Sequence, residues 1–363
     1  AVKLSIAGLR LNGSVSFEEA VGTSSRFELF PDTLRGNGDF HLNPMEGLPR
    51  GAGHPGVTGD FVHMQWEPNF NTWWSTSMDE PFNTYSDRSM DVFGRLKYTP
   101  GFLDAKGLLA FNNAELEGEV IRLFSKWIQS GRADFRVRES EMSEWSFQMD
   151  NAISEVDFVT NKGVFDLQDG DNTLTFPRNK YRANMDRAEW NIIEKYVSIS
   201  KSSNIESRLT STHDNQGGLS FLAQNAKFYL TPSLLECFGV PSIDVADSRI
   251  YPDSGRVTIE QNAFMQTLNN ASILASRSGK YHNIVNAELK IRGRNNLYGN
   301  GTYQYRDEQD VIWPIPMGRI DVDTANHIVA QGELLPESEF YLSPRFKYHG
   351  IVNMESIDPM LTV

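Results

Sequence analysis

The sequence predicts an all-β protein, built as an array of short strands with one or two short helices. Three observations lead to this fold class. Apolar and polar residues alternate over short runs, Gly, Pro, Asn and Asp close those runs, and no helical period is sustained between them. This pattern is typical of strands that pair or stack on one another rather than of strands that alternate with helices.

The clearest alternation runs from Gly217 to Tyr305. Apolar residues lie two positions apart in Ile243–Val245, Val257–Ile259 and Leu289–Ile291, which is the period of a strand. The dipeptide Asn-Ala recurs more often than the composition predicts, beginning at Asn113, Asn151, Asn225, Asn262, Asn270 and Asn286. We interpret it as a degenerate repeat of short β units, in which Asn suits tight turns.

The repeat leaves three architectures open: a solenoid-like stack, stacked sandwiches, and a long open jelly-roll or trough. Its spacing is irregular, whereas a strict parallel β-helix should be more regular. We expect an N-terminal β region at residues 1–200 with an aromatic insertion at 61–90. A polar boundary at 201–216 and a C-terminal β-repeat region at 217–363 follow.

Two segments have helical character. The first lies within residues 112–127, where four apolar residues have helical spacing: Val120, Leu123, Phe124 and Trp127. Gly118 and its β-branched neighbours favour a strand with a bulge as the alternative. The second is a single predicted turn from Met185 to Trp190.

Composition and charge exclude several classes of function. Of the 363 residues, 39% are hydrophobic and 11% aromatic, so the chain can build a packed core. The formal net charge of -13 argues against binding to nucleic acid or to an anionic membrane surface. Cys237 is the only cysteine, which excludes an internal disulfide and a cysteine-based zinc site. No apolar run approaches the ~20 residues of a membrane-spanning helix.

Both ends of the chain resemble interrupted strands. The sequence starts without a methionine inside the apolar alternation Val2, Leu4 and Ile6, and it stops at the apolar residues 361–363. We therefore expect a segment of a longer protein.

The most aromatic stretch contains candidate ligand-binding residues. Trp66, Trp73, Trp74 and Tyr85 could form a platform on which a sugar ring stacks. Glu67, Asp79 and Glu80 lie between them and are the carboxylates that a glycosidase would need. The alternative is that the rings belong to the core or cover one face of a sheet.

Asp166, Asp169 and Asp171 supply closely spaced oxygen ligands beside a glycine, as a calcium loop would. The glycine and glutamate that complete an EF-hand loop are not in register here. An ordinary acidic hairpin turn is therefore the alternative. Calcium is the one cofactor that the sequence suggests, and no other is expected.

Several runs occur in an order that resembles a known group of proteins. They include LRGNGDF (34–40), GRLKYTPGFLDAKG (94–107), FPRNKYRANMDRAEWNI (176–192), STHDNQGGLSFLAQNAKF (211–228) and IDVADSRIYPDSGRVTI (243–259). Together they resemble uncharacterised, very large β-rich proteins of the Bacteroidota cell envelope. The resemblance implies an exported chain, periplasmic or on the cell surface and associated with the outer membrane. It brings no catalytic residues.

Three functions follow from these observations as hypotheses. The first is a non-enzymatic structural or interaction segment, a scaffold or component of an outer-membrane-associated assembly whose partners are envelope proteins. The alternative is a β module that binds glycan or lipid. The lipid version rests on a looser resemblance in architecture to trough-like proteins that carry lipid between membranes. The second alternative is a carbohydrate-active enzyme on a β-helix.

Overall fold

The fold is all-β, as the sequence predicts. The computed structural model describes residues 3–5, 8–47, 52–86, 89–167, 173–202, 207–276, 278–307, 309–343 and 345–363. Over these residues the regular structure consists of strands and five short 3-10 helices of three residues each. The described part of the chain contains no helix with the length and apolar character needed to cross a bilayer.

The chain divides into two compact units. Unit 1 comprises Ala1–Asn172 and Asp186–Val197, and unit 2 comprises Thr173–Met185 and Ser198–Val363. One strand, β17 (Tyr196–Ser200), runs across the division. The units divide upstream of the polar segment 201–216, where the sequence predicts the boundary. That segment contributes a strand and a 3-10 helix to unit 2.

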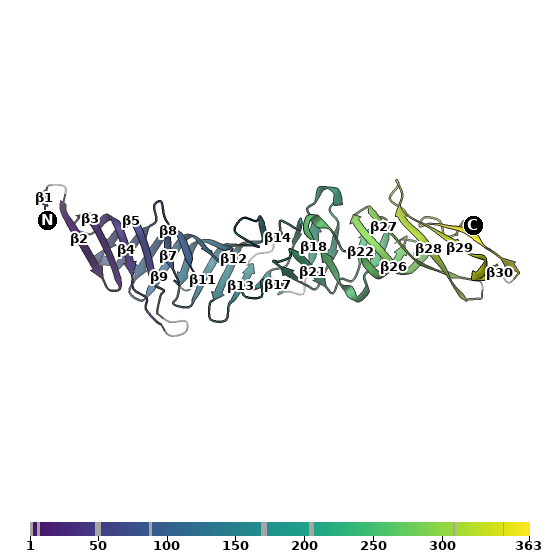
Figure 1. The fold of residues 1–363 in the computed structure, drawn as a ribbon, viewed down its shortest axis with the longest axis horizontal. Helices are drawn as coiled ribbons and strands as arrows, with labels where there is room; N and C mark the ends of the chain where they lie inside the picture. Colours follow the sequence, from purple (N-terminus) through teal and green to yellow (C-terminus); the bar gives the residue numbers. More distant parts are fainter. Residues whose placement is uncertain are drawn as a thin grey trace. The chain divides into compact units, whose positions relative to one another are not determined.

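Unit 1 is a run of antiparallel strands, most of which pair with the next strand along the chain (Figure 1). Its strands are β1 (Lys3–Ser5), β2 (Gly8–Phe17), β3 (Ala20–Leu29), β4 (Leu34–Leu42), β5 (Val57–Glu67), β6 (Thr72–Thr76), β7 (Phe82–Thr84), β8 (Met90–Thr99), β9 (Phe102–Phe111), β10 (Ala114–Leu123), β11 (Trp127–Arg138), β12 (Trp145–Asp157), β13 (Lys162–Leu167) and β16 (Arg187–Asn191).

The aromatic stretch 61–90 is part of this sheet. It forms most of β5, the short helix η1 (Pro68–Phe70), β6, β7 and the first residue of β8. Strands β6 and β7 both pair with β5 on one side and with β8 on the other, so together they occupy the place of one interrupted strand. The stretch therefore belongs to the sheet and is not an insertion into it.

The core of unit 1 is rich in aromatic side chains that point to the same face of their strands. Trp73 stacks on Phe40 with ring centroids 6.0 Å apart. Further along the unit, Phe135 stacks on Phe165 at 3.8 Å and also contacts Trp190 at 5.3 Å. All of these rings are buried, and their burial supplies much of the hydrophobic stabilisation of the unit.

Unit 2 begins with short strands and continues with longer ones. They are β14 (Leu174–Phe176), β15 (Tyr181–Ala183), β18 (Arg208–Ser211), β19 (Ser220–Leu222), β20 (Asn225–Tyr229), β21 (Leu234–Phe238), β22 (Ile243–Val245), β23 (Ser248–Tyr251), β24 (Val257–Ile259), β25 (Leu268–Ala275), β26 (His282–Gly293), β27 (Asn296–Arg306), β28 (Ile312–Val322), β29 (Ile328–Leu334), β30 (Tyr341–Ser343), β31 (Phe346–Lys347) and β32 (Gly350–Glu355). The 3-10 helices are η2 (Asp214–Gln216), η3 (Asp253–Gly255), η4 (Gln261–Ala263) and η5 (Pro336–Ser338).

The short strands of unit 2 form two ladders. One ladder contains β14, β15, β18, β19, β22, β23 and β25, and the other contains β20, β21 and β24. Phe176 of the first ladder contacts Phe228 of the second, with ring centroids 5.4 Å apart. The buried side chain of Asn179 reaches the second ladder region, where its amide donates to the carbonyl oxygens of Ser233 and Ile259, each at 3.1 Å.

At five of its six occurrences Asn-Ala marks a turn or a bulge, and the alanine is buried at all six. Five of the six asparagines have a positive φ, namely Asn113, Asn151, Asn262, Asn270 and Asn286. The alanines that follow the six asparagines are all at most 3% exposed: Ala114, Ala152, Ala226, Ala263, Ala271 and Ala287. The ladders shift register next to Asn151, Asn270 and Asn286, which is the signature of a β-bulge. Asn tolerates the left-handed conformation better than most residues, and a small alanine fits under the bulge.

Neither predicted helix is present. Residues 114–123 form β10, whose register shifts between Gly118 and Ile121, so the alternative of a bulged strand is confirmed. Val120 is 61% exposed because it lies in that bulge and not on the apolar face of a helix. The segment Met185–Trp190 contains most of β16 instead of a helical turn. In both segments, pairing with neighbouring strands overrides a helical spacing of apolar residues.

Candidate functional site

The four predicted ligand-binding rings do not share one exposed surface. Trp66 and Trp73 are opposite each other on β5 and β6, and both point toward the core. Trp73 is fully buried, and its indole N–H donates to the Ser75 hydroxyl over 3.1 Å. Trp66 is half-buried and packs on Phe17, with ring centroids 5.6 Å apart.

Trp74 points to the opposite face, as alternation along β6 requires. Its indole N–H donates to Glu67 over 3.1 Å, and the guanidinium of Arg95 lies 3.9 Å from its ring centroid. Arg95 therefore covers a ring face that a sugar would need for stacking. Glu67 also accepts a hydrogen bond from Gln65, so this carboxylate holds neighbouring side chains in place.

Tyr85 fixes a turn. It is 6% exposed, and its hydroxyl donates to the backbone carbonyl oxygens of Phe124 and Trp127, which flank the turn between β10 and β11. Burial raises the pKa of Tyr85 well above its usual value, so the hydroxyl stays protonated as a donor. Its contacts are those of a structural residue.

The structure describes only one of the three predicted calcium ligands. Asp166 lies in β13, where its carboxylate oxygens accept two hydrogen bonds from Arg187 at 2.9 and 3.0 Å. Asp169 and Asp171 lie outside the described residues. Over the residues that are described, no group of three or more His, Cys, Asp or Glu side chains is arranged to hold a metal ion.

A polar hollow of about 990 Å³ lies in unit 2. It is formed where turns that are far apart in the sequence are joined by backbone hydrogen bonds. The N–H of Arg294, in the turn between β26 and β27, donates to the carbonyl oxygen of Gln216 in η2 over 2.9 Å. The carbonyl oxygen of Arg294 in turn accepts from Ala246, in the turn between β22 and β23, over 2.7 Å.

Buried hydrogen bonds of the Gln216 side chain hold the turn that contains η2 in place. Gln216 is 6% exposed, and its side chain accepts from the Tyr181 hydroxyl over 3.1 Å and donates to the carbonyl oxygen of Ala263 over 2.6 Å. Gly217 and Gly218 follow, with φ values of +59° and +69°. Residues that carry a side chain rarely adopt this backbone conformation. A Cβ on Gly218 would meet no heavy atom within 4 Å, so the chain leaves this side of the hollow open.

Three arginines and two aspartates give the hollow its charge: Arg208, Arg249, Arg294, Asp244 and Asp247. Both aspartates are engaged. Asp244 accepts from Arg249 at 2.9 and 3.3 Å, and this contact raises the pKa of the arginine. Asp247 accepts from the backbone N–H of Ile328 over 3.0 Å and from the hydroxyl of Ser356.

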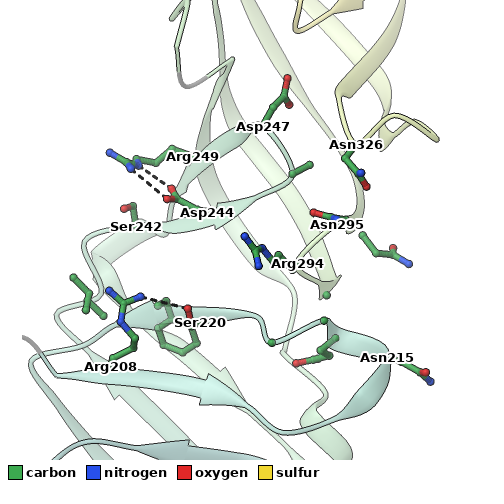
Figure 2. A pocket seen from close by; sticks show the side chains of 18 of the residues that line it. Arg208, Asn215, Ser220, Ser242, Asp244, Asp247, Arg249, Arg294, Asn295 and Asn326 are labelled. Carbon is green, nitrogen blue, oxygen red and sulfur yellow. Dashed lines mark hydrogen bonds and ion pairs between the residues drawn. The ribbon is translucent and has the colours of Figure 1, made fainter.

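The other two arginines retain donor capacity. Arg208 donates one hydrogen bond of 3.3 Å, to the Ser220 hydroxyl. In the part of the chain that the structure describes, the guanidinium of Arg294 contacts no acceptor, and Figure 2 shows it projecting into the space between Asp244 and Ser220. Asparagine side chains also line the hollow, contributed by Asn215, Asn295, Asn296 and Asn326. The hollow is therefore a polar surface of hydrogen-bond donors and acceptors, in which two guanidinium groups have donors available to a ligand.

The sequence does not predict this hollow. The turns that form it are visible as DNQGG (214–218), GRNN (293–296) and DTANH (323–327), each rich in polar turn residues. Each one alone is an ordinary hairpin signal. Their assembly depends on hydrogen bonds between residues up to 109 positions apart, which no local pattern encodes.

Comparison with known proteins does not extend these observations. No family model, no curated protein and no solved structure matches this chain.

Proposed function

We propose that this chain is a non-enzymatic interaction segment of a large bacterial envelope protein, and that it binds its partner through the polar hollow of unit 2. The observation that carries the proposal is that the acidic groups of the hollow are bound within the chain, whereas two of its arginines have unused hydrogen-bond donors. The aspartates are held in contacts within the chain, while Arg208 and Arg294 retain N–H groups that bind no acceptor among the described residues.

This inequality favours binding over catalysis. A general acid or base must reach the proton it transfers, and its carboxyl group must change protonation state during turnover. Asp244 holds Arg249 through both of its oxygens, and Asp247 holds Ile328 and Ser356. Protonation of either aspartate would weaken the contacts that shape the hollow.

The repeated hairpins support a role in assembly. Along β26 buried and exposed residues alternate, so one face of the strand packs on the core and the other faces solvent. Each further hairpin extends this outer face, which provides a long lateral surface for partners. Scaffolding within an outer-membrane-associated assembly is therefore part of the proposal.

Among ligands, the lining of the hollow favours a glycan over a lipid. Guanidinium, amide and hydroxyl groups line it, whereas a lipid chain would require a mainly apolar surface. The envelope location is part of the same proposal. The sequence motifs whose order resembles that of Bacteroidota envelope proteins support it.

Site-specific photo-crosslinking in the producing cells tests this function. A photoreactive residue replaces Asn295, which lines the hollow, and a matched variant carries it at Asn283, an exposed position on β26 outside the hollow. We expect a discrete adduct from Asn295 alone, in the envelope fraction. Recovery of the chain in the cytoplasmic fraction, or equal labelling at both positions, would contradict the proposal.

A further inference from the structure

We infer that the hollow of unit 2 recognises an anionic glycan, an oligosaccharide that carries carboxylate or phosphate groups. This inference rests on the proposed binding function and adds the chemical class of the ligand. The arginines, the neutral polar groups that line the hollow with them, and the charge of the rest of the chain support it.

The arginines account for the anionic group. A guanidinium presents N–H donors in a planar fork that matches the two oxygens of a carboxylate or phosphate. Arg249 already binds Asp244 in this two-point manner, and Figure 2 shows that pair at the edge of the hollow. Arg294 has the same donors without such a partner in the described structure, so an incoming oxyanion can take the place that Asp244 fills for Arg249.

The backbone holds Arg294 in position before a ligand arrives. Its N–H and its carbonyl oxygen are both hydrogen-bonded to neighbouring turns, at 2.9 and 2.7 Å. Only the side chain has to become ordered when an anion binds, which lowers the entropic cost of binding.

The neutral groups account for the sugar. The side-chain amides of Asn215, Asn295 and Asn326 can donate to and accept from hydroxyl groups, and the hydroxyls of Ser220 and Ser242 can do the same. A simple inorganic anion would leave most of these groups without a contact. A volume of about 990 Å³ is at the upper end of ligand pockets, which suits several sugar units better than one.

The charge of the chain makes the hollow selective. The formal net charge of -13 repels anions from most of the surface, whereas the hollow has three arginines against two aspartates. An anionic glycan is therefore drawn to one place. Its affinity should fall as salt rises, because salt screens exposed charges.

Isothermal titration calorimetry of the full chain tests the ligand class. The probes are tetragalacturonate for a carboxylated glycan, a phosphorylated mannose oligosaccharide for a phosphate-bearing one, and maltotetraose as the neutral control. We expect at least one anionic probe to bind about tenfold or more tightly than maltotetraose at low salt. The two anionic probes identify which group the hollow prefers.

Two variants and one matched control locate the binding. Arg294→Gln and Arg208→Gln should each weaken the anionic probe by about tenfold or more and leave the weak binding of maltotetraose unchanged. The control is Arg292→Gln, an exposed arginine on β26 whose guanidinium stacks on Tyr298 and does not line the hollow. It should retain the affinity of the unmodified chain. Equal thermal midpoints for all variants show that each one folds.

Other outcomes overturn the inference. Equal affinity for the neutral and anionic probes would show that charge is not recognised. Loss of binding in Arg292→Gln as well would place the site elsewhere. If no probe binds at millimolar concentration while the Asn295 crosslink persists, the ligand class is wrong and the interaction function stands. If an anionic probe binds but Asn295 gives no envelope adduct, the ligand class stands and the proposed envelope function is wrong.

Discussion

The backbone N–H of Arg294 donates a hydrogen bond of 2.9 Å to the carbonyl oxygen of Gln216, although the two residues lie far apart in the sequence. This contact joins the turn between β26 and β27 to the turn that contains η2. It therefore creates the hollow and at the same time presents the arginine side chain to it.

The approach of the two turns depends on Gly293. A Cβ at this position would lie 3.1 Å from the carbonyl oxygen of Asn215 and 3.1 Å from the Cα of Gln216. We expect Gly293→Val to lower the free energy of unfolding by about 1–3 kcal/mol, because the turns must separate to admit the side chain. Urea denaturation measures the change. Gly318→Val is the matched control, since a Cβ there meets nothing within 4 Å, and its stability should remain within about 0.5 kcal/mol of the unmodified chain.

Asn179 is a buried hydrogen-bonding centre. Its amide donates to two carbonyl oxygens, and its side-chain oxygen accepts from the Ser233 hydroxyl over 3.0 Å. Asn179→Leu leaves these buried partners unsatisfied, so we expect a loss of about 2–4 kcal/mol in the free energy of unfolding. An unchanged denaturation midpoint would show that water or relaxation replaces the network. Asn283→Leu, at an exposed asparagine, provides the comparison.

The bulge at Asn286 requires a left-handed residue. Its φ is 51°, a conformation that glycine adopts freely and that β-branched residues resist. We expect Asn286→Gly to be nearly neutral and Asn286→Val to lower the free energy of unfolding by about 1–2 kcal/mol. Asn283→Val lies on the same strand outside the positive-φ positions and should be tolerated. Equal stability of the two valine variants would contradict a conformational role for the asparagine.

His54 should make unit 1 sensitive to acid. It is fully buried, and its Nδ1 lies 3.1 Å from the carbonyl oxygen of Pro55. Among the residues that the structure describes, its Nε2 has no hydrogen-bond partner. Burial lowers the pKa of His54, partly offset by the Pro55 carbonyl and by the charge of Glu19. The folded state therefore keeps the ring neutral, while the unfolded chain takes up a proton near pH 6.5. Stability should be complete above that pH and decline below it.

Denaturation at pH 7.5 and pH 5.5 measures this effect. We expect the unmodified chain to lose up to about 1.4 kcal/mol more than His54→Gln between the two conditions. The Tyr98 hydroxyl lowers the pKa of Glu19. This carboxylate therefore stays ionised at both pH values and does not contribute to the difference in stability. The exposed His63 supplies the control, because His63→Gln should follow the unmodified chain. An identical pH dependence in His54→Gln would refute the assignment.

Much of the fold was predictable because its causes are local. Alternation along a strand places Trp73 in the core and Trp74 outside, and this depends only on the period of two. Asn-Ala was informative for the same reason, since a left-handed asparagine and a buried alanine are properties of adjacent residues. The prediction of two helices is wrong, because a helical spacing of apolar residues also occurs in a bulged strand such as β10.

The predicted aromatic platform shows the limit of this reasoning. The sequence indicates that Trp66, Trp73, Trp74 and Tyr85 are close along the chain, and burial and strand pairing then direct them to different surroundings. Trp74 is the one that points outward, and Arg95 covers it from the neighbouring strand β8. A cross-strand neighbour is set by sheet register, which a linear sequence does not display.

By itself, the sequence determined the all-β class, the strand period and the positions of many turns, because each of these depends on the conformational preferences of neighbouring residues. Tertiary structure alone decided that the turns at Gln216, Ala246 and Arg294 meet, and that Arg294 faces a hollow while Asp244 and Asp247 are engaged. These turns are separated along the chain by several strands, and the register in which those strands pair sets where the turns lie. The candidate binding site is therefore a property of the folded chain and not of any segment within it.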